Sequence, residues 1–302
     1  MKTEARIAQL AQTACIWEAC APKPGNVNRC HDFEDTGLED FLCSALAVGS
    51  AFENAARAGV GRTIWQATAD TRQLVRSNTN LGIVLLMVPL IRTCLNHSHW
   101  TEGRALTKED LDCFRRRLGS VLESLTVEDA RFAFAAIRLA QPAALGQVPQ
   151  ADVAEEPSVT LLEAMEMAKD RDSIASEYAT RYRITFDMGL PAFEQSIARG
   201  ASFSDAVVQT FLTVLEKVPD TLIARKRGID AARRVSQIAG NVLAAGGILT
   251  PRGRTELASM DRDLRDPGHT LNPGTTADIT AAAIFLYLLK NAVQGSAFKV
   301  PG

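Results

Sequence analysis

The chain lacks the features that mark several common classes of protein. Its 33 Lys and Arg residues nearly balance 35 Asp and Glu residues, giving a formal net charge of −2, so no basic surplus favours nucleic-acid binding. The longest apolar run, residues 83–91, is too short to cross a bilayer. The first six residues carry charges in place of the apolar core of a signal peptide. We therefore expect a cytoplasmic protein that binds neither nucleic acid nor membrane.

Familiar metal, redox and catalytic signatures are also absent. The six cysteines all lie in the first 113 residues and none forms a C-x-x-C pair, which excludes the usual zinc-ribbon and redox patterns. No P-loop, G-x-G-x-x-G, H-E-x-x-H or G-x-S-x-G pattern occurs. Their absence removes the common nucleotide, zinc-protease and serine-hydrolase signatures. Any functional site must therefore be built in another way.

Helical periodicity fills most of the chain, and no stretch alternates in the way of a β-strand. With 302 residues, 46% of them hydrophobic, the chain can bury a large core. We predict an all-α fold, a single compact multi-helix domain over 1–302, with an internal connection at 141–157. The predicted helices are one ending before Pro22, then 38–58, 63–76, 82–95, two that follow capping boxes at Thr107 and Thr126, then 159–181, 191–199, 204–218, 229–245 and one from 274 to about 291.

Six polar motifs interrupt this helical pattern. They are P-K-P-G-N-V-N at 22–28 followed by H-D-F-E-D at 31–35, then S-N-T-N-L-G at 77–82, A-I-R-L-A at 136–140, M-A-K-D-R-D at 167–172, D-T-L-I-A-R-K-R-G at 220–228 and L-N-P-G-T-T-A-D at 271–278. Each combines residues that bend the backbone with carboxylates, amides or cations. This distribution indicates a site assembled from several helix ends, of the kind that holds a large polar ligand.

The first motif has two interpretations. A turn with exposed backbone N–H groups beside a lysine can hold phosphate oxygens, and two carboxylates near a histidine could bind Mg²⁺ or act as acid and base. An ordinary helix–helix connection, with its aspartates capping the helix at 38, is the alternative. We favour a functional role because the cluster is denser than a turn requires. The candidate residues are Lys23, Gly25, Asn26, His31, Asp32 and Asp35.

The middle motifs are more ambiguous. Asn78, Thr79 and Asn80 precede the most hydrophobic predicted helix, where they fit either a plain N-cap or the wall of a pocket. In the 167–172 motif, Asp170 and Asp172 fall on different faces of the predicted helix, which favours salt bridges over a shared site.

The last two motifs pair hydrogen-bonding groups with cations. In 220–228, an Asp cap, three terminal cations and a Gly suit the helix dipole, although Arg225 and Lys226 could equally clamp a polyphosphate. In 271–278, Thr275 and Asp278 have capping-box spacing, but the motif follows His269 and a charged run at 261–266, which favours a site wall. His97 and His99 we place on the surface of a loop.

Several of these motifs, in this order, resemble those of the triphosphoribosyl-dephospho-CoA synthase family. The P-K-P-G-N-V turn with H-D-F after it, the N-T-N-L-G segment and the late N-P-G-T-T-A-D carry the resemblance, which extends from about Glu18 to the final helix. It implies an all-helical fold and an ATP-dependent transferase of cofactor biosynthesis. The family reaction breaks the adenine–ribose bond of ATP and transfers the triphosphoribosyl group to dephospho-CoA.

The chain departs from the named synthases at two places. They carry N-T-H-K-G where this chain has N-T-N-L-G at 78–82, so a His and a Lys are missing, and P-A-A-L-G at 142–146 stands where similar sequences read P-G-G-L-G. The D-T-L-I-A-R-K and A-I-R-L-A motifs resemble a branch found in methanogens, methylotrophs and planctomycetes. That branch is associated with one-carbon cofactors of the tetrahydromethanopterin and methanofuran type.

The resemblance implies roles for the candidate residues. We expect Mg²⁺ on the triphosphate, His31 as acid or base, and a carboxylate near the reacting C1′. The expected catalytic residues are His31, Asp32, Asp35 and Asp278, and the expected metal ligands are Asp32, Asp35, Asp172 and Asp278. The expected nucleotide-binding residues are Lys23, Gly25, Asn26, Asn78, Thr79, Asn80, Arg138, Arg225, Lys226, Asn272, Thr275 and Thr276.

The partners expected from this resemblance are ATP and a cofactor precursor of the dephospho-CoA or pterin type. Two alternatives stay open: an ATP-dependent ligase or phosphotransferase for tetrahydromethanopterin- or methanofuran-type cofactors, and a non-catalytic cofactor carrier. The oligomeric state is also open, with a homodimer as one option.

Overall fold

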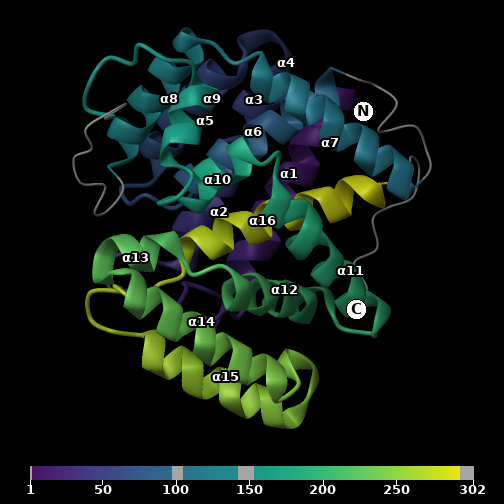
Figure 1. The fold of residues 1–302 in the computed structure, drawn as a ribbon, viewed down its shortest axis with the longest axis vertical. Coiled ribbons are helices and arrows are strands. Elements are labelled where there is room, and N and C mark those ends of the chain that lie inside the picture. Colours follow the sequence, from purple (N-terminus) through teal and green to yellow (C-terminus); the bar gives the residue numbers. More distant parts are fainter. Residues whose placement is uncertain (1, 97–104, 142–152, 293–302) are drawn as a thin grey trace. The chain divides into compact units, whose positions relative to one another are not determined.

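The computed structural model describes residues 2–96, 105–141 and 153–292 (Figure 1). Throughout these ranges the chain is helical, and an isolated antiparallel bridge between Asn28 and His31 takes the place of any strand. The all-α prediction is therefore confirmed. None of the helices in these ranges is long and apolar enough to cross a membrane. His97, His99 and the P-A-A-L-G segment lie outside the described residues.

The helices follow one another with short connections. They are α1 (Thr3–Cys20), α2 (Leu38–Ala47), α3 (Gly49–Glu53), α4 (Ala55–Ala58), α5 (Val60–Leu74), α6 (Leu81–Leu95), α7 (Lys108–Glu123), α8 (Val127–Ala140), α9 (Leu161–Ala168), α10 (Ser173–Ala179), a π-helical turn (Thr185–Gly189), α11 (Leu190–Ala198), α12 (Phe203–Lys217), α13 (Thr221–Arg227), α14 (Ile229–Ala244), a 3₁₀ turn (Gly247–Leu249), α15 (Pro251–Leu264) and α16 (Gly274–Lys290).

The chain divides into two compact units. Among the described residues, unit 1 comprises 2–16, 39–182 and 285–292, and unit 2 comprises 17–38 and 183–284. Each unit is assembled from segments that are far apart in the sequence. A single domain over the whole chain stays a prediction.

Unit 1 surrounds the buried helix α6, which contains Pro89. A proline has no N–H group, so it leaves the carbonyl four residues earlier, that of Leu85, without its helical partner. The Tyr178 hydroxyl donates to that carbonyl at 2.7 Å, and the Tyr182 hydroxyl donates to the next one, Leu86, at 2.8 Å. Burial raises the pKa of both tyrosines, which keeps these hydroxyls protonated as donors.

A glycine brings helices α5 and α8 into close contact within unit 1. A Cβ atom on Gly61 would lie 2.4 Å from the Asp129 Cα, and the Gly61 N–H donates to the Asp129 carboxylate at 2.7 Å. The same carboxylate closes the predicted capping box with Thr126 at the start of α8. The capping box of Thr107 and Asp110 is likewise confirmed.

In unit 2, α12 packs against α11 and α14 around an aromatic cluster. The Phe203 ring lies 4.6 Å from that of Trp17 and 4.9 Å from that of Phe193, measured between ring centroids. Gly189, in the π-helical turn, permits a close approach, because its Cβ would lie 2.9 Å from the Ala283 Cβ.

Two predicted helices are wrong in extent, and a third was missed. The predicted helix 159–181 is divided between α9 and α10, since the Asp172 side chain accepts from the N–H groups of Ile174 and Ala175 and starts a new helix. The prediction that placed Asp170 and Asp172 within one helix is therefore wrong as well. Helix α15 was not predicted, because its charged sequence has little apolar periodicity.

The predicted helix 38–58 forms three short helices. The Gln12 amide donates to the carbonyls of Ala45 and Leu46, which would otherwise accept from residues four positions later. Gly49 leaves room for this side chain, since a Cβ there would lie 2.6 Å from the Gln12 amide nitrogen. The break is therefore made by a residue 33 positions away.

Candidate functional site

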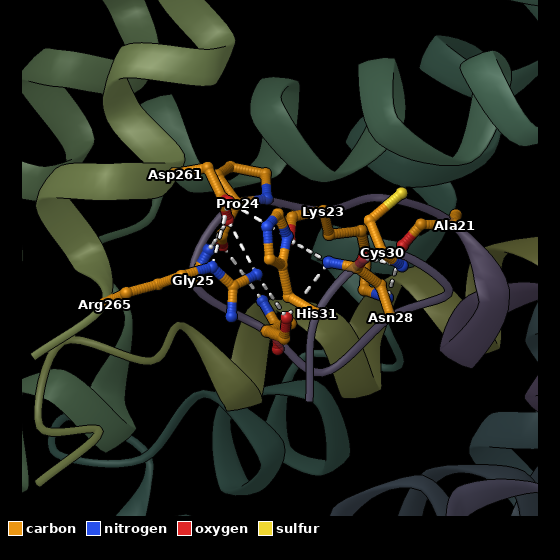
Figure 2. Close-up of polar contacts among 10 residues, drawn as sticks. Ala21, Lys23, Pro24, Gly25, Asn28, Cys30, His31, Asp261 and Arg265 are labelled. Carbon is orange, nitrogen blue, oxygen red and sulfur yellow. Dashed lines mark hydrogen bonds and ion pairs between the residues drawn. The ribbon is translucent and has the colours of Figure 1, made fainter. Parts of the chain in front are cut away.

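The first motif forms a loop in unit 2 whose lysine is internal. Lys23 is fully buried, and its ammonium lies 2.9 Å from the Glu18 carboxylate and also donates to the Glu18 carbonyl (Figure 2). A cation held in this way has little access to a ligand. The prediction that Lys23 contacts phosphate is therefore wrong for this structure, and Lys23 serves to hold the end of α1 to the loop.

Amide side chains shape the same loop. Asn28 donates to the carbonyls of Lys23 (3.2 Å) and Asn26 (3.0 Å) and accepts from the Cys30 N–H at 2.9 Å. The Asn26 amide donates to the Pro24 carbonyl at 3.2 Å. These side chains take the place of backbone partners in an irregular segment. They explain why the motif contains two asparagines.

Helix α15 supplies the charged groups that anchor this loop. The Asp261 carboxylate accepts from the Gly25 N–H at 2.9 Å and from the Arg265 guanidinium at 2.9 Å, while Arg265 donates to the Asn26 carbonyl at 2.9 Å (Figure 2). Gly25 has a φ of +73°, and a Cβ there would lie 2.9 Å from that of Leu264. The Gly25 N–H, expected to face phosphate, thus faces a carboxylate instead.

His31 pairs with the same carboxylate. Its Nδ1 lies 3.5 Å from Asp261 Oδ2, and its side chain is 54% exposed (Figure 2). A carboxylate that engages Nδ1 orients the imidazole and leaves Nε2 as the nitrogen that can exchange a proton with a ligand. This geometry suits the predicted acid–base role of His31. Asp261 was known from the sequence only as part of a charged run.

The two aspartates after His31 are exposed. Asp32 accepts from the Leu38 N–H at 2.8 Å, which makes it a cap for the start of α2, as the structural alternative expected. Asp35 accepts from the Thr36 hydroxyl at 3.1 Å. Its negative charge also acts on Lys226, whose pKa it raises in part. Asp35 therefore lies in the electrostatic environment of the 220–228 motif.

Asp220 joins two helix starts. It is 1% exposed, and one of its oxygens accepts from the N–H groups of Leu222 and Ile223 at the start of α13. The other accepts from the Thr276 N–H at 2.7 Å and the Thr276 hydroxyl at 2.8 Å, in the first turn of α16. Burial raises the pKa of Asp220 above its usual 3.8, although these hydrogen bonds oppose the shift.

Thr275 and Thr276 therefore lie within the first turn of α16. The Thr221 hydroxyl donates to that of Thr275 at 3.2 Å. Because α16 begins at Gly274, Thr275 is not an N-cap, and the capping-box interpretation of Thr275 and Asp278 is wrong. Asp278 lies one turn further along the helix and is partly exposed.

The cations of the 220–228 motif occupy the last turn of α13. Arg225 and Lys226 are partly buried and Arg227 is exposed. The Lys226 ammonium donates to the His269 carbonyl at 3.0 Å. Burial lowers the pKa of Lys226 below its usual 10.5, although the carboxylates of Asp266 and Asp220 act in the opposite direction. This turn is the densest group of cations in the motif set.

The loop that receives Lys226 is held by an aspartate. Asp266 accepts from the Thr270 N–H at 2.7 Å, the Thr270 hydroxyl at 2.8 Å and the Leu271 N–H at 3.2 Å. Burial raises the pKa of Asp266, but these hydrogen bonds outweigh it and lower the pKa below 3.8. The His269 ring stacks on Phe33, with 3.8 Å between centroids. The D-P-G turn signal at 266–268 could have identified this loop from sequence.

Five predicted site residues belong to unit 1 and have local structural partners. Asn78 accepts from the Leu81 N–H at 3.2 Å, the Thr79 hydroxyl lies 2.5 Å from that of Ser44, and Asn80 donates to the Thr71 hydroxyl at 3.1 Å. Asn78 thus acts as a cap near the start of α6, one of the two interpretations of that motif. The other two residues are Arg138, which donates to the Val153 carbonyl at 2.6 Å, and Asp172, the N-cap of α10.

The carboxylates do not form a ready-made metal centre. In the part of the chain that the structure describes, no three His, Cys, Asp or Glu residues lie together as a metal-binding group. Mg²⁺ in nucleotide sites commonly takes one or two carboxylates and completes its shell with phosphates and water. The exposed Asp32 and Asp35 and the partly exposed Asp278 suit that mode of binding. A magnesium site remains a prediction.

Comparison with known proteins identifies the family. A family model described as CitG, ATP:dephospho-CoA triphosphoribosyl transferase, matches residues 4–296. The chain belongs to this family. The predicted resemblance is thereby confirmed at the level of the CitG family.

Individual relatives are similar over shorter stretches. A 2-(5''-triphosphoribosyl)-3'-dephosphocoenzyme-A synthase from Klebsiella pneumoniae is 33% identical over 99 residues, covering 33% of this chain and 35% of the relative. One from Pectobacterium atrosepticum is 32% identical over 111 residues, covering 37% and 35%. The matched segments thus span about a third of the length of these curated relatives.

A solved structure agrees over a longer range. The crystal structure of a provisionally assigned triphosphoribosyl-dephospho-CoA synthase from Archaeoglobus fulgidus superposes with a TM-score of 0.61 and 26% identity. The superposition covers 82% of this chain and 98% of that one. The all-helical CitG fold therefore extends well beyond the segments shared with the curated relatives.

Proposed function

We propose that this member of the CitG family is an ATP-dependent triphosphoribosyl transferase of cofactor biosynthesis. The observation that carries the proposal is the family match over residues 4–296. In the reaction, an acceptor hydroxyl oxygen forms a bond to C1′ of the ATP ribose while the bond from C1′ to adenine breaks. The hydroxyl loses its proton and adenine leaves with one, so atoms and charge balance.

The groups in unit 2 suit this chemistry. Breaking the bond to adenine builds positive charge on C1′ in an oxocarbenium-like transition state, which a carboxylate stabilises. Asp35 and Asp278 are the accessible carboxylates for this role. His31, oriented through Nδ1 by Asp261, exchanges a proton with the acceptor hydroxyl or the departing base through Nε2. Arg225 and Lys226 neutralise the triphosphate.

Mg²⁺ would add further charge neutralisation on the triphosphate when bound. We assign its protein ligands to Asp32, Asp35 and Asp278 on the basis of their exposure. Asp172, the fourth predicted ligand, is the least suited to this role because its carboxylate already caps α10.

The acceptor is the finer part of the proposal. Dephospho-CoA is the acceptor named for the family. A pterin-type precursor, as expected for the branch of methanogens, methylotrophs and planctomycetes, is the second candidate. It is favoured by the Asn80-Leu81 pair, because Asn80 is buried and bonded to Thr71 where the named synthases carry a His and a Lys. An acceptor that relies less on cations at this position fits that replacement.

A mass-spectrometric assay tests the reaction. The purified protein is incubated with ATP and Mg²⁺ and either dephospho-CoA or late tetrahydromethanopterin precursors. Free adenine together with a triphosphoribosyl adduct is the expected result, and the adduct identifies the acceptor. Release of ADP or AMP without adenine would instead support a ligase or phosphotransferase. Binding without consumption would support a cofactor carrier.

Variants separate the site from the fold. His31→Gln should lower the rate of adenine release by about 10²–10⁴-fold, the usual contribution of a general acid or base. Asp278→Asn should also abolish most turnover. Asp230→Asn, at an exposed position on α14, is the matched control and should leave turnover unchanged. Wild-type turnover in both site variants would refute the assigned roles.

A further inference from the structure

The loop between α15 and α16 holds two buried polar atoms that the fold does not satisfy. Within the described residues, neither Nδ1 of His269 nor Oδ1 of Asn272 has a hydrogen-bond partner, although both atoms are buried. Leaving such an atom unsatisfied costs stability, so native proteins rarely do so without a reason. The two residues are three positions apart on one short loop, which makes a shared reason plausible chemically.

The backbone places His269 in an unfavourable conformation. Its φ is +48°, in the left-handed region that residues other than glycine rarely adopt. Three contacts hold it there: the His269 N–H donates to the Asp266 carbonyl at 2.9 Å, the His269 carbonyl accepts from Lys226 at 3.0 Å, and the ring stacks on Phe33. Strain maintained by several independent contacts is characteristic of functional positions. The imidazole is thus fixed in place before any ligand arrives.

The surroundings define what could satisfy these atoms. With its proton on Nε2, His269 presents Nδ1 as an acceptor, and the amide oxygen of Asn272 is an acceptor as well. Two acceptors call for a ligand group with two N–H donors. Lys226, at the His269 carbonyl, adds a cation that favours an anionic ligand. Phe33 adds an apolar face that suits an aromatic ring.

We propose that His269 and Asn272 form a subsite that recognises the exocyclic amine of an adenine nucleotide. The two N–H groups of the amine donate to His269 Nδ1 and Asn272 Oδ1, while Lys226 contacts the phosphates. The inference rests on the proposed use of an adenine nucleotide. Hypoxanthine carries a carbonyl oxygen at the same position, which would face two acceptors and be rejected.

Adenine occurs in both ATP and dephospho-CoA, so the two sources must be separated. Equilibrium binding of ATP, inosine triphosphate and dephospho-CoA is measured for the wild-type protein. We expect ATP to bind about tenfold to a hundredfold more tightly than inosine triphosphate. Equal affinity for the two triphosphates, together with no effect of the variants below on dephospho-CoA binding, would overturn the proposal.

Three variants test the residues. His269→Gly removes the acceptor and tolerates the positive φ, and Asn272→Leu removes the amide at similar volume. Both should lose the discrimination between ATP and inosine triphosphate. His269→Asn keeps an acceptor at the δ position and also tolerates this backbone, so it should restore part of it. Loss of affinity for ATP alone assigns the subsite to ATP, and loss for dephospho-CoA alone assigns it to the acceptor.

A matched control addresses a purely structural role. Ser236 on α14 also has a buried hydroxyl without a partner in the described residues, so Ser236→Ala removes a similar atom elsewhere in unit 2. It should leave the affinity ratio unchanged. If the His269 and Asn272 variants change only the free energy of unfolding, as a structural role predicts, the subsite is refuted.

The proposed function and this subsite fail in different ways. Base discrimination that depends on His269, without adenine release from any acceptor, would leave the subsite standing and refute the transferase reaction. Adenine release that continues in the variants with an unchanged affinity ratio would refute the subsite and leave the reaction standing.

Discussion

Lys23 and Glu18 have side chains that are only 0% and 4% exposed, so their ion pair lies away from water. Removing one partner of such a pair leaves the other charge buried and uncompensated. Lys23→Met should therefore lower the free energy of unfolding by about 3–5 kcal/mol, as measured by urea denaturation. Lys217→Met, at an exposed position of α12, is the control and should change it by less than about 0.5 kcal/mol.

A double variant distinguishes the buried charge from simple loss of packing. Glu18→Leu combined with Lys23→Met removes both charges and should recover part of the lost stability. If the double variant is less stable than Lys23→Met alone, the buried charge is not the main cause of destabilisation.

Asp266 gives a prediction about pH. Because hydrogen bonds hold its folded-state pKa below 3.8, its stabilising contribution is present above pH 3.8 and is lost as the pH falls through the folded-state value. Asp266→Asn should therefore be less stable than wild type near neutral pH, and the difference should shrink below pH 3.8. Urea unfolding across this range measures it. A difference that stays constant would contradict the role, and Asp263→Asn on the same helix controls for loss of one surface charge.

At the scale of elements, the docking of the 21–37 loop on α15 depends on a glycine. Gly25→Ala places a Cβ 2.9 Å from that of Leu264 and 3.2 Å from Pro273 Cδ, in addition to the strain of a residue at a φ of +73°. Gly200→Ala shares the positive φ, but nothing lies within 4 Å of its Cβ. We expect Gly25→Ala to be more destabilising than Gly200→Ala by about 1–3 kcal/mol in urea denaturation.

The same comparison has a functional consequence. Displacing the loop from α15 would separate His31 from Asp261, so Gly25→Ala should also lower adenine release, whereas Gly200→Ala should not. Equal stability of the two variants would mean that Leu264 and Pro273 shift easily and that the loop tolerates a side chain.

Breaks between helices were also decided at this scale. Capping boxes are local signals, and those at Thr107 and Thr126 were predicted correctly. The interruption between α2 and α3 depends on Gln12, which is 33 residues away from the carbonyl it binds at Ala45. A pattern within one window of sequence does not contain that information.

At the scale of the whole molecule, nucleotide binding should stabilise the protein. A ligand that binds only the folded state adds about 2.7 kcal/mol to the free energy of unfolding at 100 times its Kd. ATP with Mg²⁺ should therefore raise Tm, and EDTA should reduce the shift if the metal takes part. Lys226→Met should weaken it, while Lys217→Met should not. No shift with ATP at any concentration would contradict nucleotide binding.

The sequence by itself determined the all-helical class, most helix positions, the caps and the family, because each depends on local periodicity or on short motifs. Tertiary structure alone decided that Lys23 is buried against Glu18 and that Asp261 of α15 orients His31 and binds Gly25, 236 residues earlier. It also decided that His269 stacks on Phe33. These pairings arise from packing between distant segments, where burial and charge compensation depend on neighbours that no local pattern specifies.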